Sequence, residues 1–111
     1  MKINLIDIAN DAPIDYYNDF PYESHPFPQS AVENIEAIAF LFGLNVPAAC
    51  TARVLELGCA AGGNLIPFAA RHKSSSCLGV DLSSIQIQQG QCVIARAGLS
   101  NIELRAMNLA D

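Results

Sequence analysis

The stretch that decides the fold is Val54-Leu55-Glu56-Leu57-Gly58-Cys59-Ala60-Ala61-Gly62-Gly63-Asn64. Its first part, Arg53–Leu57, is short and mainly apolar, which predicts a buried strand. The glycine-rich run Gly58–Gly63 predicts a sharp turn after that strand, because glycine adopts backbone conformations that other residues avoid. A helix is expected from about Asn64 to Arg71. A strand, a glycine-rich turn and a helix in this order are typical of a ligand site, where free amides at the start of the helix face the ligand.

The same alternation continues toward the C-terminus. Cys77–Val80 predicts a second buried strand, and Ser83-Ser84-Ile85-Gln86 is a capping box that opens a helix. This helix is expected to run to Ala97 and to stop at Gly98. Ile102 to Met107 predicts a third strand. The order strand, helix, strand, helix, strand predicts an α/β fold, a Rossmann-like parallel sheet with flanking helices.

Residues 1–29 form an acidic arm that is rich in aromatic side chains and prolines, which argue against a helix. The aromatic residues of the arm are Tyr16, Tyr17, Phe20, Tyr22 and Phe27. Two interpretations stay open, a lid that packs on a ligand or partner and a strap that covers the core. After the arm, a capping box formed by Ser30 and Glu33 predicts a helix that ends at Gly43.

Composition and charge exclude several classes of protein. The chain has 111 residues, 51% of them hydrophobic, and a formal net charge of −5 at pH 7. Its length predicts one domain, and its few basic residues argue against nucleic-acid binding. No apolar run approaches the ~20 residues of a membrane span, and the start lacks the pattern of a signal peptide. The four cysteines form no CxxC pair, so we expect no metal site, reduced thiols and a cytoplasmic location.

An acidic residue at the end of the second strand points to a nucleoside ligand. Asp81 follows Gly58 at roughly the 20-residue distance at which nucleotide folds place the acceptor of ribose hydroxyls. Two ligand classes are compatible with the glycine-rich run. Compared with the dinucleotide pattern GxGxxG, the run has Ala60 in place of the second glycine, which lets a pyrophosphate approach the backbone, and this counts against NAD. Compared with the pattern ExGxGxG, which begins at Glu56, the run again has Ala60 in place of one glycine. The ligand of that second pattern carries no pyrophosphate, so the methyl group of Ala60 obstructs it less.

These residues resemble a known family. Residues 54–64, together with Gly79-Val80-Asp81-Leu82-Ser83, look like the first two motifs of class I S-adenosylmethionine-dependent methyltransferases, and residues 101–111 resemble the third strand and its loop. The arm segment Pro21–Ser30 is similar to the leader of bacterial methyltransferases that carry a methyltransferase regulatory domain, a group related to rickettsial protein-lysine methyltransferases. The resemblance covers roughly residues 15–111. It implies that residues 30–111 are the N-terminal half of a cofactor-binding domain.

The resemblance also implies where S-adenosylmethionine would bind. Glu56 would organise the glycine-rich loop or approach the ammonium group of the cofactor. Asp81 would accept the ribose hydroxyls, Leu82 would pack on the adenine, and Asp111 would lie near the adenine amino group. The methionine part would be lined, mostly by backbone, by Gly58, Cys59, Ala60 and Gly62. The acceptor is expected to be a protein lysine or a small molecule, and the sequence identifies no catalytic residue.

The sheet that the resemblance implies is incomplete. The strand order 3-2-1 leaves one edge of the strand at residues 53–57 without a neighbour, and an open apolar edge invites pairing with another chain. We therefore expect either a fragment of a longer enzyme, inactive alone because the acceptor-binding half is missing, or a homo-oligomer. Two alternatives to a methyltransferase remain, a fragment that binds an NAD-type dinucleotide and a non-catalytic module that self-associates.

Overall fold

The computed structural model describes residue 18 and residues 23–110. The aromatic arm residues Tyr16, Tyr17, Phe20 and Tyr22, and the candidate site residue Asp111, lie outside the described residues.

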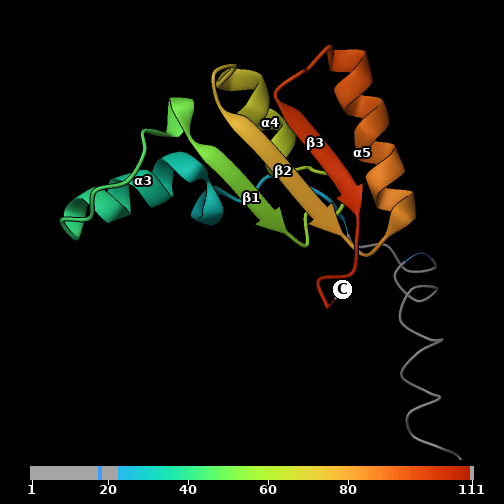
Figure 1. The fold of residues 1–111 in the computed structure, drawn as a ribbon, viewed down its shortest axis with the longest axis horizontal. Helices are drawn as coiled ribbons and strands as arrows, with labels where there is room; N and C mark the ends of the chain where they lie inside the picture. The colour runs from blue at the N-terminus through green and yellow to red at the C-terminus, as the bar shows by residue number, and fades with distance from the viewer. Residues whose placement is uncertain (1–17, 19–22, 111) are drawn as a thin grey trace, which may run out of the picture.

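A three-stranded parallel sheet forms the centre of the structure (Figure 1). Its strands are β1 (Arg53–Leu57), β2 (Ser76–Asp81) and β3 (Ile102–Ala106), arranged in the order β1-β2-β3. Leu57 pairs with Val80 of β2, so the ends of β1 and β2 lie next to each other. The predicted Rossmann-like sheet, its parallel strands and its strand order are therefore confirmed.

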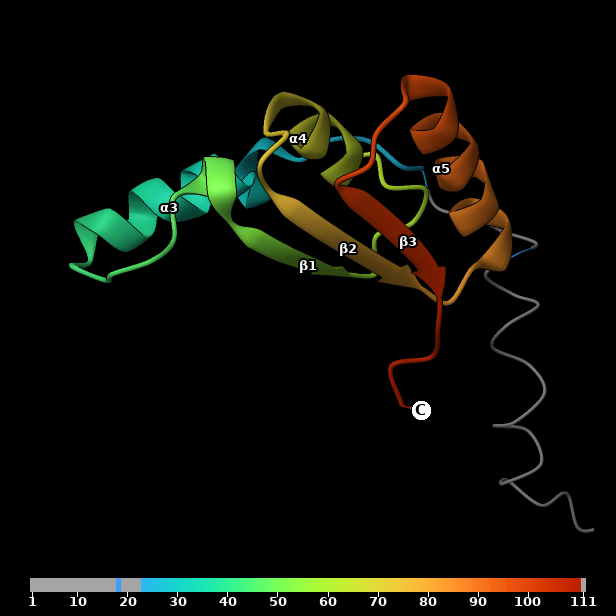
Figure 2. The same ribbon diagram turned by 45° about the horizontal axis from the view of Figure 1, so that its top comes forward.

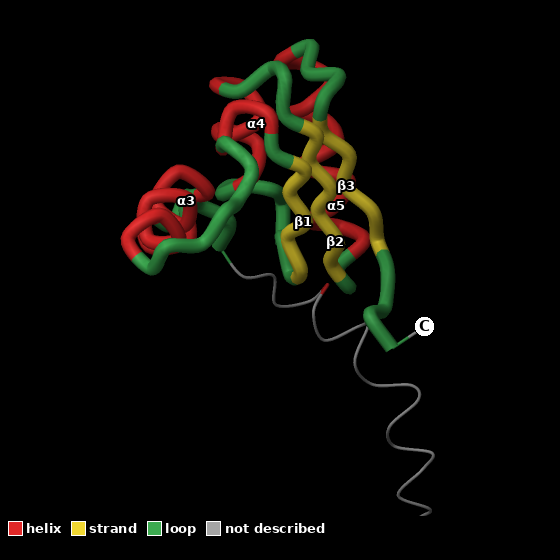
Figure 3. Tube along the Cα trace, turned by 60° about the vertical axis from the view of Figure 1, so that its left-hand side comes forward, coloured by secondary structure: helices red, strands yellow, loops and turns green. Residues whose placement is uncertain are grey.

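Helices α4 (Leu65–Arg71) and α5 (Ser84–Ala97) both cover one face of the sheet (Figure 2). The caps of α5 are the predicted ones, because the Ser83 side chain accepts a hydrogen bond from the Gln86 amide at 3.3 Å. Gly98 ends the helix with a φ of 64°, a left-handed conformation that favours glycine. Helix α3 (Val32–Leu41) lies beside β1 at one end of the sheet, and α5 lies toward the other end, as Figures 1 and 3 show.

The core lies between the sheet and helices α4 and α5, and Leu104 of β3 is at its centre with 2% of its surface exposed. Glycines on three surrounding elements make room for this side chain. A Cβ atom at Gly62, Gly79 or Gly90 would lie 3.1, 2.6 or 2.4 Å from a methyl carbon of Leu104. Small residues in the loop, in β2 and in α5 thus allow the three elements to pack tightly around one leucine.

The predicted capping box at the start of α3 is wrong. The N-cap residue is Ala31, which makes no side-chain cap, and Ser30 instead ends a short 3-10 helix, Pro28–Ser30. The Glu33 carboxylate reaches α4, where it accepts hydrogen bonds from Arg71 at 3.0 Å and His72 at 2.9 Å. These bonds lower the pKa of Glu33 to about 2, together with a backbone hydrogen bond that is the largest cause. Tertiary contacts therefore outweigh the local capping pattern.

Large apolar side chains remain exposed on α3 and β1. Phe40 and Leu41 have about four fifths of their surface exposed, and Leu55 and Leu57 have 59%. Within the described residues, no other strand pairs with the free edge of β1.

No helix among the described residues combines the length and the apolar character that crossing a bilayer requires.

Candidate functional site

Two adjoining clefts lie at the carboxyl ends of the strands, where ligands bind in parallel α/β sheets. The larger cleft, about 570 Å³, lies between arm residues 23–27 and the end of β1 with its glycine-rich loop. The smaller cleft, about 240 Å³, lies between Leu82 and the segment Met107–Leu109 that follows β3. Gly58 and Asp81 line both clefts. A ligand that extends across these two residues can therefore occupy both spaces.

Asp81 is directed at the glycine-rich loop, as the sequence predicted. One carboxylate oxygen accepts a hydrogen bond from the Ala60 amide at 2.8 Å, and the other accepts one from the Ser83 amide at 2.9 Å. The residue thus joins the loop after β1 to the start of α5. Because each carboxylate oxygen has two lone pairs, both oxygens keep the capacity to accept a ligand hydroxyl.

The loop owes its shape to three residues in the left-handed region, Gly58 at φ 73°, Ala60 at φ 50° and Gly62 at φ 78°. Glycine adopts this conformation without strain, whereas an alanine there costs ~1–2 kcal/mol. The hydrogen bond from the Ala60 amide to Asp81 holds the strained residue in place. The turn therefore has the shape that the glycine-rich pattern predicted, with one strained position where the pattern has alanine.

Several amides of the glycine-rich loop donate to acceptors within the chain. The amides of Gly58 and Cys59 donate to the Val80 carbonyl, and the Gly62 amide donates to the Cys59 carbonyl. The Gly63 amide donates to the Ser24 hydroxyl at 2.8 Å. The loop therefore shapes the wall of the larger cleft, while the polar groups available to a ligand there include carboxylates.

Glu56 supplies a carboxylate with one oxygen that has no hydrogen-bond partner in the described part of the chain. Its Oε1 atom accepts a hydrogen bond from the Asn64 side-chain amide at 2.9 Å. Its Oε2 atom is buried without a hydrogen-bond partner among the described residues. Burial raises the pKa of Glu56, and the bond from Asn64 opposes this change. A buried carboxylate oxygen without a partner is destabilising. Glu56 as a residue also lines the larger cleft, where its charge can attract a cationic group of a ligand.

Cys59 is a buried packing residue of the loop and not a reactive thiol. Only 4% of its surface is exposed, and a Cβ atom at Gly79 would lie 2.8 Å from its sulfur. Burial, together with the charges of Asp81 and Glu56, raises the pKa of the Cys59 thiol to about 12. The thiol therefore stays protonated at neutral pH, which leaves it a poor nucleophile.

The arm segment that precedes α3 packs directly on the glycine-rich loop. A Cβ atom at Gly63 would lie 2.5 Å from backbone atoms of Ser24 and His25, so only glycine fits there. The Phe27 amide donates to the Asn64 side-chain oxygen at 2.9 Å, and the rings of His25 and Phe27 lie 4.3 Å apart. The described part of the arm thus acts as a strap over the loop and also lines the larger cleft.

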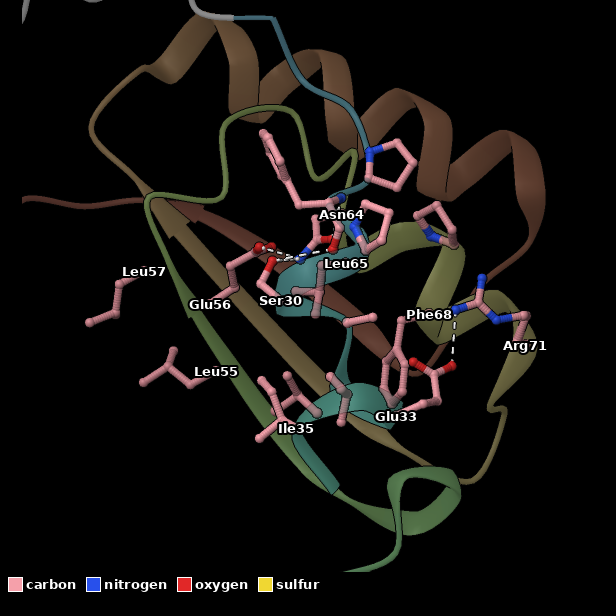
Figure 4. Close-up of a pocket in the computed structure, with 17 residues that line it drawn as sticks. Ser30, Glu33, Ile35, Leu55, Glu56, Leu57, Asn64, Leu65, Phe68 and Arg71 are labelled. Atoms are coloured by element: carbon pink, nitrogen blue, oxygen red, sulfur yellow. Dashed lines mark hydrogen bonds and ion pairs between the residues drawn. The ribbon is translucent and has the colours of Figure 1, made fainter. Parts of the chain in front are cut away.

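Sequence reasoning missed several residues of this site, among them Ser24 and Asn64. Asn64 follows the glycine run directly, which is a signal that could have identified it, whereas Ser24 lies 39 positions from the amide that it binds. Figure 4 shows Glu56, Asn64 and Ser30 turned toward one another beside a groove of about 480 Å³ between α3, β1 and α4. Within the described residues, no group of three His, Cys, Asp or Glu side chains is arranged to hold a metal ion.

Comparison with known proteins identifies the class. Residues 54–111 match a family described as a methyltransferase domain, and this match covers more than half of the chain. The chain therefore belongs to the methyltransferase domain family, which confirms the family that the sequence motifs predicted.

Relatives and solved structures narrow the comparison. The chain is 41% identical over 95 residues to the uncharacterized protein RP789 of Rickettsia prowazekii (strain Madrid E), a match that covers 86% of this chain and 17% of that protein. It is also similar to the structure of PKMT2 from Rickettsia typhi in complex with AdoHcy, with 42% identity and a TM-score of 0.77. That match covers 82% of this chain and 18% of PKMT2, so the chain spans about a fifth of these relatives.

A more distant structure shares the fold alone. Coclaurine N-methyltransferase has 17% identity and a TM-score of 0.52 over 83% of this chain and 26% of its own.

Proposed function

We propose that this chain is the cofactor-binding part of an S-adenosylmethionine-dependent methyltransferase and that the two adjoining clefts hold the cofactor. The observation that carries the proposal is the pair of carboxylates at these clefts, with Glu56 lining the larger cleft and Asp81 at the junction of the two. The similarity to PKMT2, whose structure was solved with AdoHcy, supports the same ligand class.

The residues present are suited to each part of the cofactor. Glu56 would pair with the ammonium group of the methionine part, along a wall formed by Gly58, Cys59 and Ala60. Gly62, which the resemblance also placed along this part of the cofactor, does not line the cleft, because a Cβ atom there would meet Ile66 and Leu104. Asp81 would accept the ribose hydroxyls through the lone pairs that its two backbone partners leave. Leu82, beside residues 107–109, would contact the adenine in the smaller cleft. Asp111 lies outside the described residues, and its proposed role near the adenine amino group rests on the resemblance alone.

The charges of the larger cleft favour this ligand over a dinucleotide. The carboxylates of Glu23, Glu56 and Asp81 line one cleft. S-adenosylmethionine carries an ammonium and a sulfonium, which these carboxylates attract, and one carboxylate, so its net charge is positive. A pyrophosphate would meet repulsion from them, and five of the loop amides that could compensate already donate to acceptors within the chain. An NAD-type ligand is therefore the weaker alternative.

Bound S-adenosylmethionine supplies a methyl group on a sulfonium, which is activated for transfer to a nucleophile. Methyl transfer depends on holding donor and acceptor in line, so the main task of these residues is orientation. The resemblance of the arm supports a protein lysine or a small molecule as the acceptor class. The carboxylates and the strap along the cleft would fix the donor in one orientation and limit its contact with water.

Isothermal titration calorimetry with S-adenosylhomocysteine and with NADH tests the proposal on the purified chain. We expect S-adenosylhomocysteine to bind and NADH not to bind. Replacement of Glu56 by glutamine, which keeps the shape and removes the charge, is expected to weaken binding by about tenfold or more, since hydrogen bonds to charged groups contribute ~1.5–3 kcal/mol. Binding of NADH alone, or of neither ligand, would contradict the proposal.

We also propose that the chain self-associates through the free edge of β1 and the apolar surface of α3. The exposure of Leu55, Leu57, Phe40 and Leu41 supports this, because an open apolar edge strand favours pairing. Light scattering at high micromolar concentration measures the mass of the particle in solution, and a monomer there would contradict the proposal.

We propose a cytoplasmic location as well. The four cysteines support it, because all four are free thiols and disulfides are rare in the cytosol.

A further inference from the structure

Asn64 occupies the N-cap position of α4, but its side chain does not cap the helix. This contrasts with α5, where the N-cap side chain of Ser83 bonds the backbone in the usual way. The Asn64 amide nitrogen instead donates to Oε1 of Glu56 at 2.9 Å, and its oxygen accepts from the Phe27 amide at 2.9 Å. The two bonds together determine the orientation of the amide, because reversing it would place a donor against a donor.

We propose that Asn64 is a positioning residue, which holds the Glu56 carboxylate at the larger cleft through its amide nitrogen and holds the arm through its amide oxygen. The ligand role of this inference rests on the proposed function, since it concerns the ammonium group of S-adenosylmethionine. The effect of Asn64 on Glu56 itself is a property of the ligand-free chain and can be measured separately.

The charge state of Glu56 explains why such a residue is needed. Burial raises the pKa of Glu56, and the hydrogen bond from Asn64 lowers it, so Asn64 favours the ionised form. Asp81 from the end of β2 and Glu23 from the arm line the same cleft as Glu56. His25 of the arm and Cys59 of the loop are the other titratable groups along its wall. Without Asn64, the carboxylate would retain a proton up to a higher pH and attract an ammonium less.

The link to the arm follows from the second bond of Asn64. Phe27 is held to Asn64, and Ser24 is held separately to the Gly63 amide. Release of the arm would therefore free the Asn64 oxygen without removing the amide nitrogen from Glu56. Ser24→Ala offers a matched control, because it loosens the same arm segment but removes no contact of Glu56.

The experiment is an NMR titration of the Glu56 side-chain carboxyl carbon in the ligand-free chain. We expect the titration midpoint of Glu56 to move to higher pH in Asn64→Ala and to stay unchanged in Ser24→Ala, while amide exchange of residues 24–27 becomes faster in both. Asn64→Asp is a second variant that keeps the shape and the acceptor for the Phe27 amide, and we expect the midpoint to rise there as well. An unchanged midpoint in both Asn64 variants, or an equal shift in Ser24→Ala, would overturn the proposal.

Calorimetry then tests the ligand role. S-adenosylhomocysteine carries the ammonium, whereas 5′-methylthioadenosine lacks the amino-acid part. We expect Asn64→Ala to weaken the first ligand by about tenfold, corresponding to ~1.4 kcal/mol, and to leave the second unchanged. Equal weakening of both ligands would overturn the proposed link to the ammonium. Failure of the unmodified chain to bind S-adenosylhomocysteine, with the Glu56 midpoint still shifted in Asn64→Ala, would contradict the proposed function and support the positioning role.

Discussion

Replacement of Gly63 by alanine is expected to release the arm from the glycine-rich loop. The added Cβ atom would lie 2.5 Å from the Ser24 carbonyl carbon and from the His25 nitrogen. These are backbone atoms, so they cannot escape by a change of side-chain rotamer. Gly63 has no left-handed φ, so an alanine there adds no backbone strain of its own. The substitution therefore acts through the arm alone.

The size of the effect follows from the contacts that the arm would lose. The arm is held to the loop by the Ser24 and Phe27 hydrogen bonds. Each bond stabilises the closed arm by a net ~0.5–1.5 kcal/mol, because the groups bond to water when the arm is open. Loss of both corresponds to ~1–3 kcal/mol, which is roughly a 5- to 150-fold rise in the open population of the arm. The core around Leu104 does not contain the arm, so its stability should change little.

Hydrogen exchange measured by mass spectrometry checks this prediction. Peptides that contain residues 24–27 should exchange faster in Gly63→Ala by that factor, while peptides from β2 and β3 keep the protection of the unmodified chain. Gly98→Ala is the matched control, because its Cβ atom has nothing within 4 Å but its φ is 64°. The control should lower global stability without selectively exposing the arm. Unchanged exchange of residues 24–27 in Gly63→Ala would refute the packing argument.

Three further predictions concern the loop, an ion pair and the thiols. Ala60→Gly should raise the free energy of unfolding in urea by up to ~1 kcal/mol, because glycine removes the strain at φ 50°, and a loss of stability would contradict this. The pKa of Glu33 is lowered from 4.5 to about 2 in the folded chain, so its stabilising effect is present above pH 4.5 and is lost as the pH falls toward 2. Unfolding free energies of the unmodified chain and Glu33→Gln should therefore differ at pH 7 and converge toward pH 2, and a difference that does not depend on pH would count against the hydrogen bonds to the ionised carboxylate. A maleimide at pH 7.5 should modify the exposed Cys50 and Cys92 in the native chain and spare Cys59, and early labelling of Cys59, detected by peptide mapping, would show that it is not buried.

Local sequence patterns determined the strands, the glycine-rich turn and the caps of α5. The strand Arg53–Leu57 has the bounds that its apolar pattern predicted. The cap at Ser83 and the stop at Gly98 also agree with the structure, because both act on backbone groups within four residues. Asp81 could be placed beside the loop because parallel strands bring their carboxyl ends to one edge of a sheet.

Only the tertiary structure decided which partners the polar groups take. The pattern at Ser30 and Glu33 predicted a local cap, but Arg71 and His72, nearly 40 positions away, provide partners for the carboxylate. The loop amides take acceptors from β2 and from the arm in the same way. The unpaired Oε2 atom of Glu56 likewise depends on Asn64 and on the packing around it. Periodicity and caps are properties of neighbouring residues, whereas these contacts join distant segments, and only the packing of the arm and α4 brings them within hydrogen-bond distance.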